Sequence, residues 1–220
     1  MRLVSKNTLQ NKKILVTGGP TWVRLDAARV ISNMSSGLMA RDIVHALLEQ
    51  GAKVTYLAGP AIFGLNRGTK ARVVPFLFFE DLEKSLTAEL KKPYDAVIHA
   101  AAVADYRPQK TIAAKLASGR KEWKITLIPT PKLIRKIKQI NPRAYLVGFK
   151  LEPGLTEKKA QREAIRLAGT NACDLVVANS VDGGQYRGLV FDPQGRCLKT
   201  VRSRPAMARS LTQILAEHFG

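Results

Sequence analysis

Short apolar segments alternate with amphipathic segments along most of this sequence, and this alternation limits the possible folds more than any other feature. The run 13–17 is apolar and leads into the Gly-Gly-Pro turn at 18–20, as a buried strand entering a tight loop would. Within 38–50 the apolar residues recur at helical spacing, and a second apolar run follows at 53–58. This order predicts a parallel sheet with right-handed crossovers.

The same alternation continues to the C-terminus. It predicts further strands at 73–76, 95–100, 124–128, 144–150 and 174–178, helices at 80–91, 131–140 and 156–169, a hairpin of 187–191 with 197–201, and a final helix from about residue 205. We expect a flexible leader at 1–11 and a looser basic stretch at 105–123. The whole chain, 1–220, is predicted to be one α/β domain: a Rossmann-like three-layer sandwich with a mostly parallel sheet and a C-terminal hairpin.

Composition excludes several classes of protein. No stretch approaches the roughly 18–20 continuous apolar residues of a membrane span, and the N-terminal residues contain no apolar block suited to secretion, so we expect a cytoplasmic protein. Two Cys and three His argue against a disulfide framework and a zinc cluster.

The net charge of +19 is the one extreme value of the composition. It indicates either a polyanionic partner or a well-solvated basic surface. The basic residues are spread along the chain and aromatic residues make up only 6% of it, which argues against nucleic acid as the main partner. Small phosphorylated substrates fit this charge at least as well.

Ligands of an open parallel sheet bind at the carboxyl ends of its strands, so the loops that follow the strands are the candidate sites. In the first loop, Gly18 and Gly19 could bring backbone amides close to a phosphate, although glycines also follow strands simply to turn the chain. In the third, Ala101 and Ala102 leave room for a planar ligand or for tight packing, and Asp105 supplies a carboxylate.

The second loop precedes the predicted helix 38–50, whose free N–H groups and dipole favour an anion. This loop combines a guanidinium, an amide and two hydroxyls, from Arg29, Asn33, Ser35 and Ser36, followed by Gly37. It could therefore hold a phosphate or an acyl phosphate. The alternative is that one serine caps the helix and the arginine lies on the surface.

A short-chain dehydrogenase is a competing interpretation, because Thr17-Gly18-Gly19 is similar to the start of that family and Tyr106 and Lys110 mimic its catalytic pair. The pair must lie on one helix face, and Pro108 would break that helix. The dinucleotide fingerprint G-x-G-x-x-G is also absent after Gly18. The sequence therefore disfavours this function.

Taken together, the motifs resemble the ligase domain of phosphopantothenoylcysteine synthetase, that is, phosphopantothenate-cysteine ligase. The matching runs are Val16–Thr21, Leu25–Gly37, Gly51–Thr55 with Gly59-Pro60, Asp95–Pro108, Leu127–Lys132, Gly148–Glu152 and Leu175–Asn179. They cover roughly residues 12–215 in the family's order. In many bacteria this domain is fused behind a flavin-dependent decarboxylase, and the resemblance implies the free-standing ligase here.

The resemblance implies a reaction and a role for each loop. The family activates the phosphopantothenate carboxylate as an acyl nucleotidylate and then transfers the acyl group to cysteine. By analogy, Lys115 on a flap at 107–121 serves the first step, and Arg29, Asn33 and Ala101 serve the second. The implied nucleotide contacts are Gly18, Gly19, Ser35, Ser36, Gly37, Ala102, Asp105 and Phe149, with Asp105 also a candidate ligand of Mg²⁺.

The chain also departs from the family pattern. Trp22-Val23-Arg24 and Ala27 replace an acidic residue and prolines, and Leu38-Met39-Ala40 replaces Lys-Met-Gly. These departures bear on substrate affinity and nucleotide choice. From the resemblance we expect a homodimer that prefers CTP to ATP and uses Mg²⁺. An inactive relative that binds a nucleotide or nucleic acid remains the alternative.

Overall fold

The computed structural model describes residues 8–60, 65, 68–119 and 121–220, and its centre is an eight-stranded sheet in the order β12-β11-β10-β9-β6-β1-β4-β5. The six strands from β10 to β5 run parallel, and β11 and β12 extend the sheet antiparallel. The strands of this sheet are β1 (Lys13–Gly18), β4 (Lys53–Ala58), β5 (Arg72–Pro75), β6 (Ala96–His99), β9 (Tyr145–Leu151), β10 (Leu175–Asp182), β11 (Gln185–Phe191) and β12 (Cys197–Val201). The predicted Rossmann-like sandwich is confirmed.

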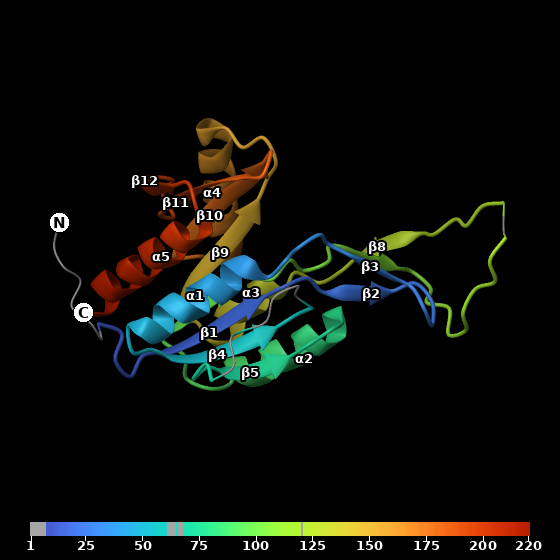
Figure 1. The fold of residues 1–220 in the computed structure, drawn as a ribbon, viewed down its shortest axis with the longest axis horizontal. Coiled ribbons are helices and arrows are strands. Elements are labelled where there is room, and N and C mark those ends of the chain that lie inside the picture. Colours follow the sequence, from blue (N-terminus) through green and yellow to red (C-terminus); the bar gives the residue numbers. More distant parts are fainter. Residues whose placement is uncertain (1–7, 61–64, 66–67, 120) are drawn as a thin grey trace.

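Helices cover both faces of the sheet (Figure 1). One face packs against α1 (Leu38–Glu49) and α5 (Arg204–Phe219), which also lie against each other. The other face packs against α2 (Phe79–Leu90), α3 (Leu133–Ile140) and α4 (Glu157–Asn171). Because both faces are covered, β1 is buried from its second residue to its last, as the apolar run 13–17 predicts. Among the described residues, no helix has the length and apolar character needed to cross a bilayer.

Four short strands form an arm that extends away from this body (Figure 1). The antiparallel pairs are β2 (Trp22–Arg24) with β3 (Val30–Ser32), and β7 (Tyr106–Pro108) with β8 (Leu127–Pro129). We call the described residues of 22–32 and 106–129 the arm, and those of 109–126 within it the flap, which overlaps the flap expected at 107–121. The sequence predicted neither the β2–β3 hairpin nor β7, because three-residue strands in polar surroundings leave no periodic pattern.

The expected leader needs a correction. Residues 1–7 lie outside the described part of the chain, but Leu9 is fully buried and its backbone N–H donates to the carbonyl of Gln50 at 3.0 Å. Leu9, within the expected leader, is therefore packed against the end of α1. A single leucine among polar residues gave too weak a signal to predict this.

Candidate active site at the carboxyl edge of the sheet

The strand order reverses between β1 and β6, since successive crossovers lead from β1 outward to β4 and from β6 outward to β9. Such a switch point is where open α/β sheets bind ligands. Two backbone hydrogen bonds join the loop after β1 to the loop after β6. Ala102 N–H donates to the Gly19 carbonyl at 2.9 Å, and Thr21 N–H donates to the Ala102 carbonyl at 3.2 Å. The first and third candidate loops therefore meet.

The two glycines of the first loop are required by close packing. A Cβ on Gly18 would lie 2.1 Å from Cβ of Ala40 in α1, and Gly19 has a positive φ of 84°. A side chain at either position would therefore clash or strain the backbone. This gives the glycines a structural reason, whether or not they also contact a nucleotide.

Asn33 links the second loop to the third. Its amide nitrogen donates to the carbonyls of Ala102 at 3.2 Å and Val103 at 3.1 Å. Because carbonyls can only accept, these contacts fix the orientation of the amide, and its oxygen must face the other way. Asn33 is exposed, so this oxygen is available to accept a hydrogen bond from a ligand.

The N-terminus of α1 lies directly beyond Asn33. Its N-cap is Gly37, with a φ of 72° and no side-chain cap, and the Ser36 hydroxyl reaches only Leu38 N–H, at 3.5 Å. The alternative that one of these serines caps the helix is therefore not supported. An uncapped helix start keeps its amide groups and its positive dipole end for an anion.

Arg29 and the flap are held together by a residue that sequence analysis did not assign to the site. The carboxylate of Asp26 is fully buried, pairs with the Arg29 guanidinium at 2.6 Å, and accepts the backbone N–H of Leu116 at 3.2 Å. The same guanidinium donates to the Leu116 carbonyl at 3.3 Å. We call these three residues the Asp26 anchor. The only available signal was the Leu-Asp pair within the family motif.

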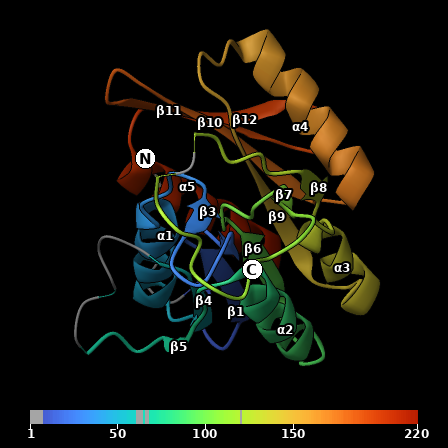
Figure 2. The same cartoon turned by 90° about the vertical axis from the view of Figure 1, so that its right-hand side faces the viewer.

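The anchor is electrostatically well satisfied. Hydrogen bonds from the backbone N–H of Ala28 first, and then those of Leu116 and Arg29, hold the pKa of Asp26 below its ordinary value despite burial. The Arg29 guanidinium also lies 5.4 Å from the centre of the Trp123 ring, which sequence analysis likewise missed. Lys115 is exposed and directly precedes the anchored Leu116. Figure 2 shows the arm end on, with its two hairpins side by side.

The remaining predicted site residues lie at the same edge of the sheet. Asp105 is largely exposed and forms an ion pair with Lys132. Phe149 follows Gly148, the register partner of His99, and is half-buried against the α1–α5 side of the core. In the part of the chain that the structure describes, no three His, Cys, Asp or Glu side chains cluster as a metal site would require.

A buried pair supports the third loop from below. The Thr17 hydroxyl accepts the backbone N–H of Ala101 at 3.3 Å and lies 2.9 Å from Nδ1 of His99. Burial lowers the pKa of His99 to about 4, so the ring is neutral at pH 7. Sequence analysis had no signal for this support.

Comparison with known proteins places this fold in a family. The pattern of the DNA/pantothenate metabolism flavoprotein C-terminal domain matches residues 9–211. The coenzyme A biosynthesis bifunctional protein CoaBC of Thermococcus kodakarensis is 36% identical over 82% of this chain and 44% of its own length. The Escherichia coli K12 protein of the same name is 32% identical over 80% of this chain and 42% of its own length. The chain thus spans less than half of these relatives.

Solved structures agree with this assignment at the level of the fold. The DNA/pantothenate metabolism flavoprotein of Streptococcus pneumoniae has a TM-score of 0.85 with 24% identity, covering 94% of this chain and 99% of that one. A Cab2 mutant in complex with phosphopantothenate-cysteine has a TM-score of 0.77 with 18% identity, covering 96% and 88%. From the match over residues 9–211 and the identity to its relatives, the chain belongs to the DNA/pantothenate metabolism flavoprotein C-terminal domain family.

Proposed function

We propose that this protein is a ligase that joins 4'-phosphopantothenate to cysteine. The observation that carries the proposal is the meeting of three loops at the switch point, where Asn33 is bound to the Ala102 and Val103 carbonyls beside the open start of α1. Support also comes from the relatives, which are named coenzyme A biosynthesis proteins, and from the Cab2 relative, which holds phosphopantothenate-cysteine.

The reaction has two steps. A carboxylate oxygen of phosphopantothenate attacks the α-phosphorus of a nucleoside triphosphate, and pyrophosphate leaves. The cysteine amine then attacks the acyl carbon of the nucleotidylate, loses a proton, and displaces the nucleoside monophosphate. Both steps build negative charge on phosphoryl or acyl oxygens, which positioned cations and N–H donors stabilise.

We assign Lys115 to the first step and Arg29, Asn33 and the Ala101 backbone to the second. The fixed Asn33 oxygen suits an incoming amine, because it can accept a hydrogen bond from the attacking nitrogen. The Asp26 anchor adds to this assignment: since Arg29 holds Leu116, it also restrains the neighbouring Lys115. Arg29 should therefore influence both steps.

The nucleotide would lie over the switch point. Its phosphates would meet the start of α1 at Ser35, Ser36 and Gly37, and its base and sugar would lie near Ala102 and Phe149. Magnesium commonly binds to one or two carboxylates together with substrate phosphates. Mg²⁺ would therefore enter this site mainly with the phosphates of the nucleotide, and Asp105 is the carboxylate that we assign to it. The ion would help to neutralise phosphate charge.

Finer assignments remain predictions. We expect CTP to be preferred over ATP, and we expect a homodimer in which one subunit's flap helps to complete the other's site. A cytoplasmic location is expected as well. Each is supported by the family resemblance.

The decisive experiment measures pyrophosphate release with CTP or ATP, phosphopantothenate and Mg²⁺, with and without cysteine. Cysteine-dependent turnover is expected. Lys115→Ala should slow pyrophosphate release about 100-fold, whereas Asn33→Ala should still form the acyl nucleotidylate and fail to transfer it.

Lys121→Ala is the matched control for the flap, since Lys121 is also exposed there, and it should keep most of the activity. No turnover with either nucleotide would overturn the proposal in favour of an inactive relative. If such a protein co-eluted with nucleic acid, and retention fell steeply with salt, binding of nucleic acid would be its function.

A further inference from the structure

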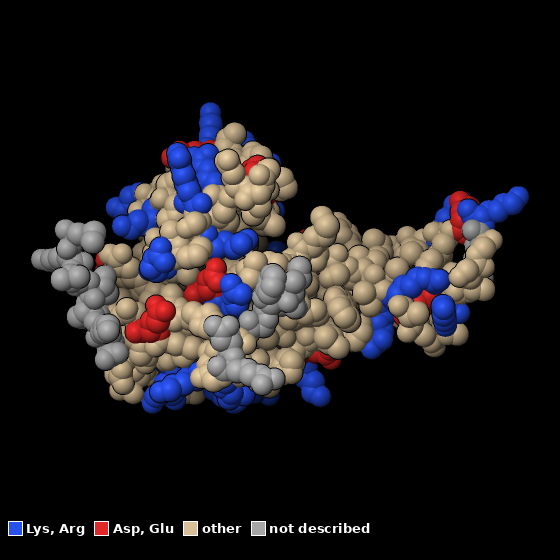
Figure 3. Space-filling view, viewed as in Figure 1, with Lys and Arg blue, Asp and Glu red and all other residues tan. Residues whose placement is uncertain are grey.

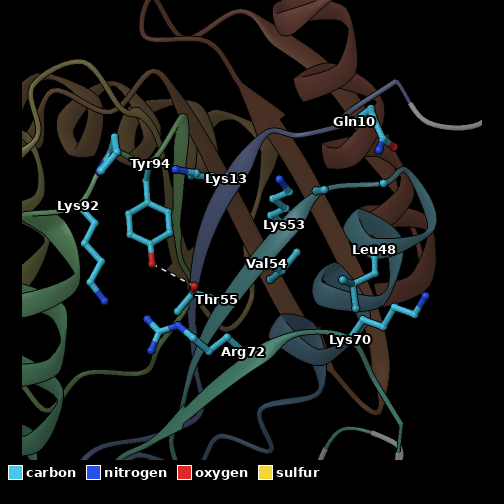
Figure 4. A pocket seen from close by; sticks show the side chains of 13 residues that line it. Gln10, Lys13, Leu48, Lys53, Val54, Thr55, Lys70, Arg72, Lys92 and Tyr94 are labelled. Carbon is cyan, nitrogen blue, oxygen red and sulfur yellow. Dashed lines mark hydrogen bonds between the residues drawn. The ribbon is translucent and has the colours of Figure 1, made fainter.

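A second cavity lies at the opposite edge of the sheet from the candidate active site. It has a volume of about 770 Å³ and opens at the amino ends of β1, β4 and β5 (Figure 4). This volume is within the roughly 300–1,000 Å³ that ligand sites occupy. Nothing in the proposed ligase reaction uses this edge.

The lining of the cavity is strongly basic. Five of its residues carry positive charge and none is an acid; the five are Lys13, Lys53, Lys70, Arg72 and Lys92. They come from three neighbouring strands and from the segments that precede β5 and follow α2. Such a lining lowers the free energy of an anion within it.

Two of these lysines lie at directly opposite positions on neighbouring strands. Lys13 and Lys53 are register partners at the starts of β1 and β4, so their side chains leave the same face of the sheet about 5 Å apart. Within the described residues, neither ammonium group has a carboxylate partner, and the nearby Asp95 accepts the backbone N–H of Lys13 instead. Like charges directly opposite each other are unfavourable, and a bound anion would relieve this repulsion.

Two other cations, Arg72 and Lys92, are held in place by a buried carboxylate. Buried Glu89 pairs with Arg72 and, at 2.9 Å, with Lys92, and it accepts the Tyr94 hydroxyl at 2.6 Å. Burial alone would raise the pKa of Glu89, but these three partners bring it down to about 2, so the acid stays ionised at neutral pH. Arg72 and Lys92 are thereby fixed before any ligand arrives, while Lys13, Lys53 and Lys70 supply the excess charge.

We propose that this cavity binds a small anion that carries at least two phosphate groups. The cations span three adjacent strands, about 10 Å in all, which exceeds the reach of one phosphate and suits a short polyphosphate chain. A nucleic acid would favour a continuous basic stripe, whereas Lys and Arg form separate groups on the face shown in Figure 3. This site is independent of the proposed ligase activity.

Lysine labelling read by mass spectrometry tests the proposal residue by residue. An amine-reactive reagent is applied to the full chain with and without tripolyphosphate, with inorganic phosphate as the weaker comparison. We expect tripolyphosphate to slow the labelling of Lys13, Lys53 and Lys70 several-fold. Lys158 and Lys199, which are exposed on α4 and β12, should label at unchanged rates. The residue-level readout separates this cavity from any phosphate bound near Lys115.

A matched pair of double variants then measures the affinity by calorimetry. Lys13→Ala with Lys53→Ala should weaken the tripolyphosphate binding that protects this cavity about tenfold. Lys158→Ala with Lys199→Ala removes the same charge elsewhere and should leave that affinity within about twofold. Equal losses in both variants, or no protection of the cavity lysines, would overturn the proposal. Tighter binding of a single-stranded oligonucleotide, lost in the Lys13 and Lys53 variant alone, would also overturn it and assign the surface to nucleic acid.

Discussion

In the body, β1 and β6 are buried on both faces between two layers of helices, and their stability comes from apolar side chains such as Leu15 and Ile98. In the arm, a few polar contacts tie the flap to the β2–β3 hairpin. The buried carboxylate of Asp26 bonds to Arg29 and Leu116, and the Ile112 N–H donates to the Leu25 carbonyl at 3.3 Å. Loss of one methyl group should disturb the body locally, whereas loss of one charge should release a whole segment of the arm.

This difference teaches where motion can occur without unfolding. Apolar packing is spread over many contacts, so the body opens as a unit. The Asp26 anchor is concentrated in a few polar contacts, and it can open while the sheet remains intact. Four measurements can break or sharpen this comparison.

The largest effect is expected in the body. Leu15→Ala removes a fully buried side chain from the centre of the sheet, and it should lower the free energy of unfolding by about 3.5 kcal/mol. Denaturant unfolding measures it. The control is Leu151→Ala at a position that is 57% exposed, where a change below about 0.5 kcal/mol is expected. Equal losses at the two positions would contradict the layered core.

Acid should weaken the body before the arm. Burial lowers the folded-state pKa of His99 from 6.5 to about 4, so between these values the unfolded chain binds more protons than the folded one. Stability is therefore complete above about pH 6.5 and falls as pH drops toward 4, by about 3 kcal/mol. Urea unfolding at several pH values measures this slope.

His99→Gln should remove most of that slope, and His45→Gln, which leaves the buried ring in place, should keep it. The anchor behaves differently, because the pKa of Asp26 is lowered: its contribution is present above the ordinary carboxyl pKa and is lost only as pH falls through the lower folded value. If the flap opened at pH 5 while the body stayed intact, the prediction that acid weakens the body before the arm would be wrong.

Asp26→Asn should loosen the arm selectively. The buried charge that orients Arg29 is lost, so amide hydrogen exchange across residues 109–126 should rise about tenfold while the strands of the body change little. Asp182→Asn is the control, since Asp182 also accepts a backbone N–H, from Gly154 at 3.0 Å, but lies outside the arm. Faster exchange in β1 and β6 to the same degree would show that arm and body are not separate units.

The smallest effect concerns Trp123. Its ring lies under the Arg29 guanidinium, and such contacts are worth about 0.5–1 kcal/mol at exposed sites, so Trp123→Ala should speed flap exchange about two- to fivefold. Trp123→Phe keeps an aromatic face, so its rate of flap exchange should fall between those of Trp123→Ala and the native protein. An effect as large as that of Asp26→Asn would mean that the ring, and not the carboxylate, is the main restraint.

The sequence predicted the body far better than the arm. Strands such as 53–58 and helices such as 38–49 show a periodic pattern of apolar residues, and this pattern can be recognised in a single sequence. The choice of the loops after the strands as candidate sites followed from the rule for parallel sheets. The Asp26 anchor joins residues 90 positions apart, and a single Asp has no periodic context, so no local pattern could reveal its contact with Leu116. The pairing of Thr17 with His99 was hidden for the same reason.

The contact at Leu116 has a consequence for chain entropy. A structureless loop of the length of 109–126 would be unusually long within a compact fold. Leu116 is held through both its N–H and its carbonyl, and the Ile112 N–H donates to the Leu25 carbonyl at 3.3 Å. These contacts divide the flap into shorter spans. Each span has far fewer conformations than the whole, so a ligand that orders one of them need not order the others.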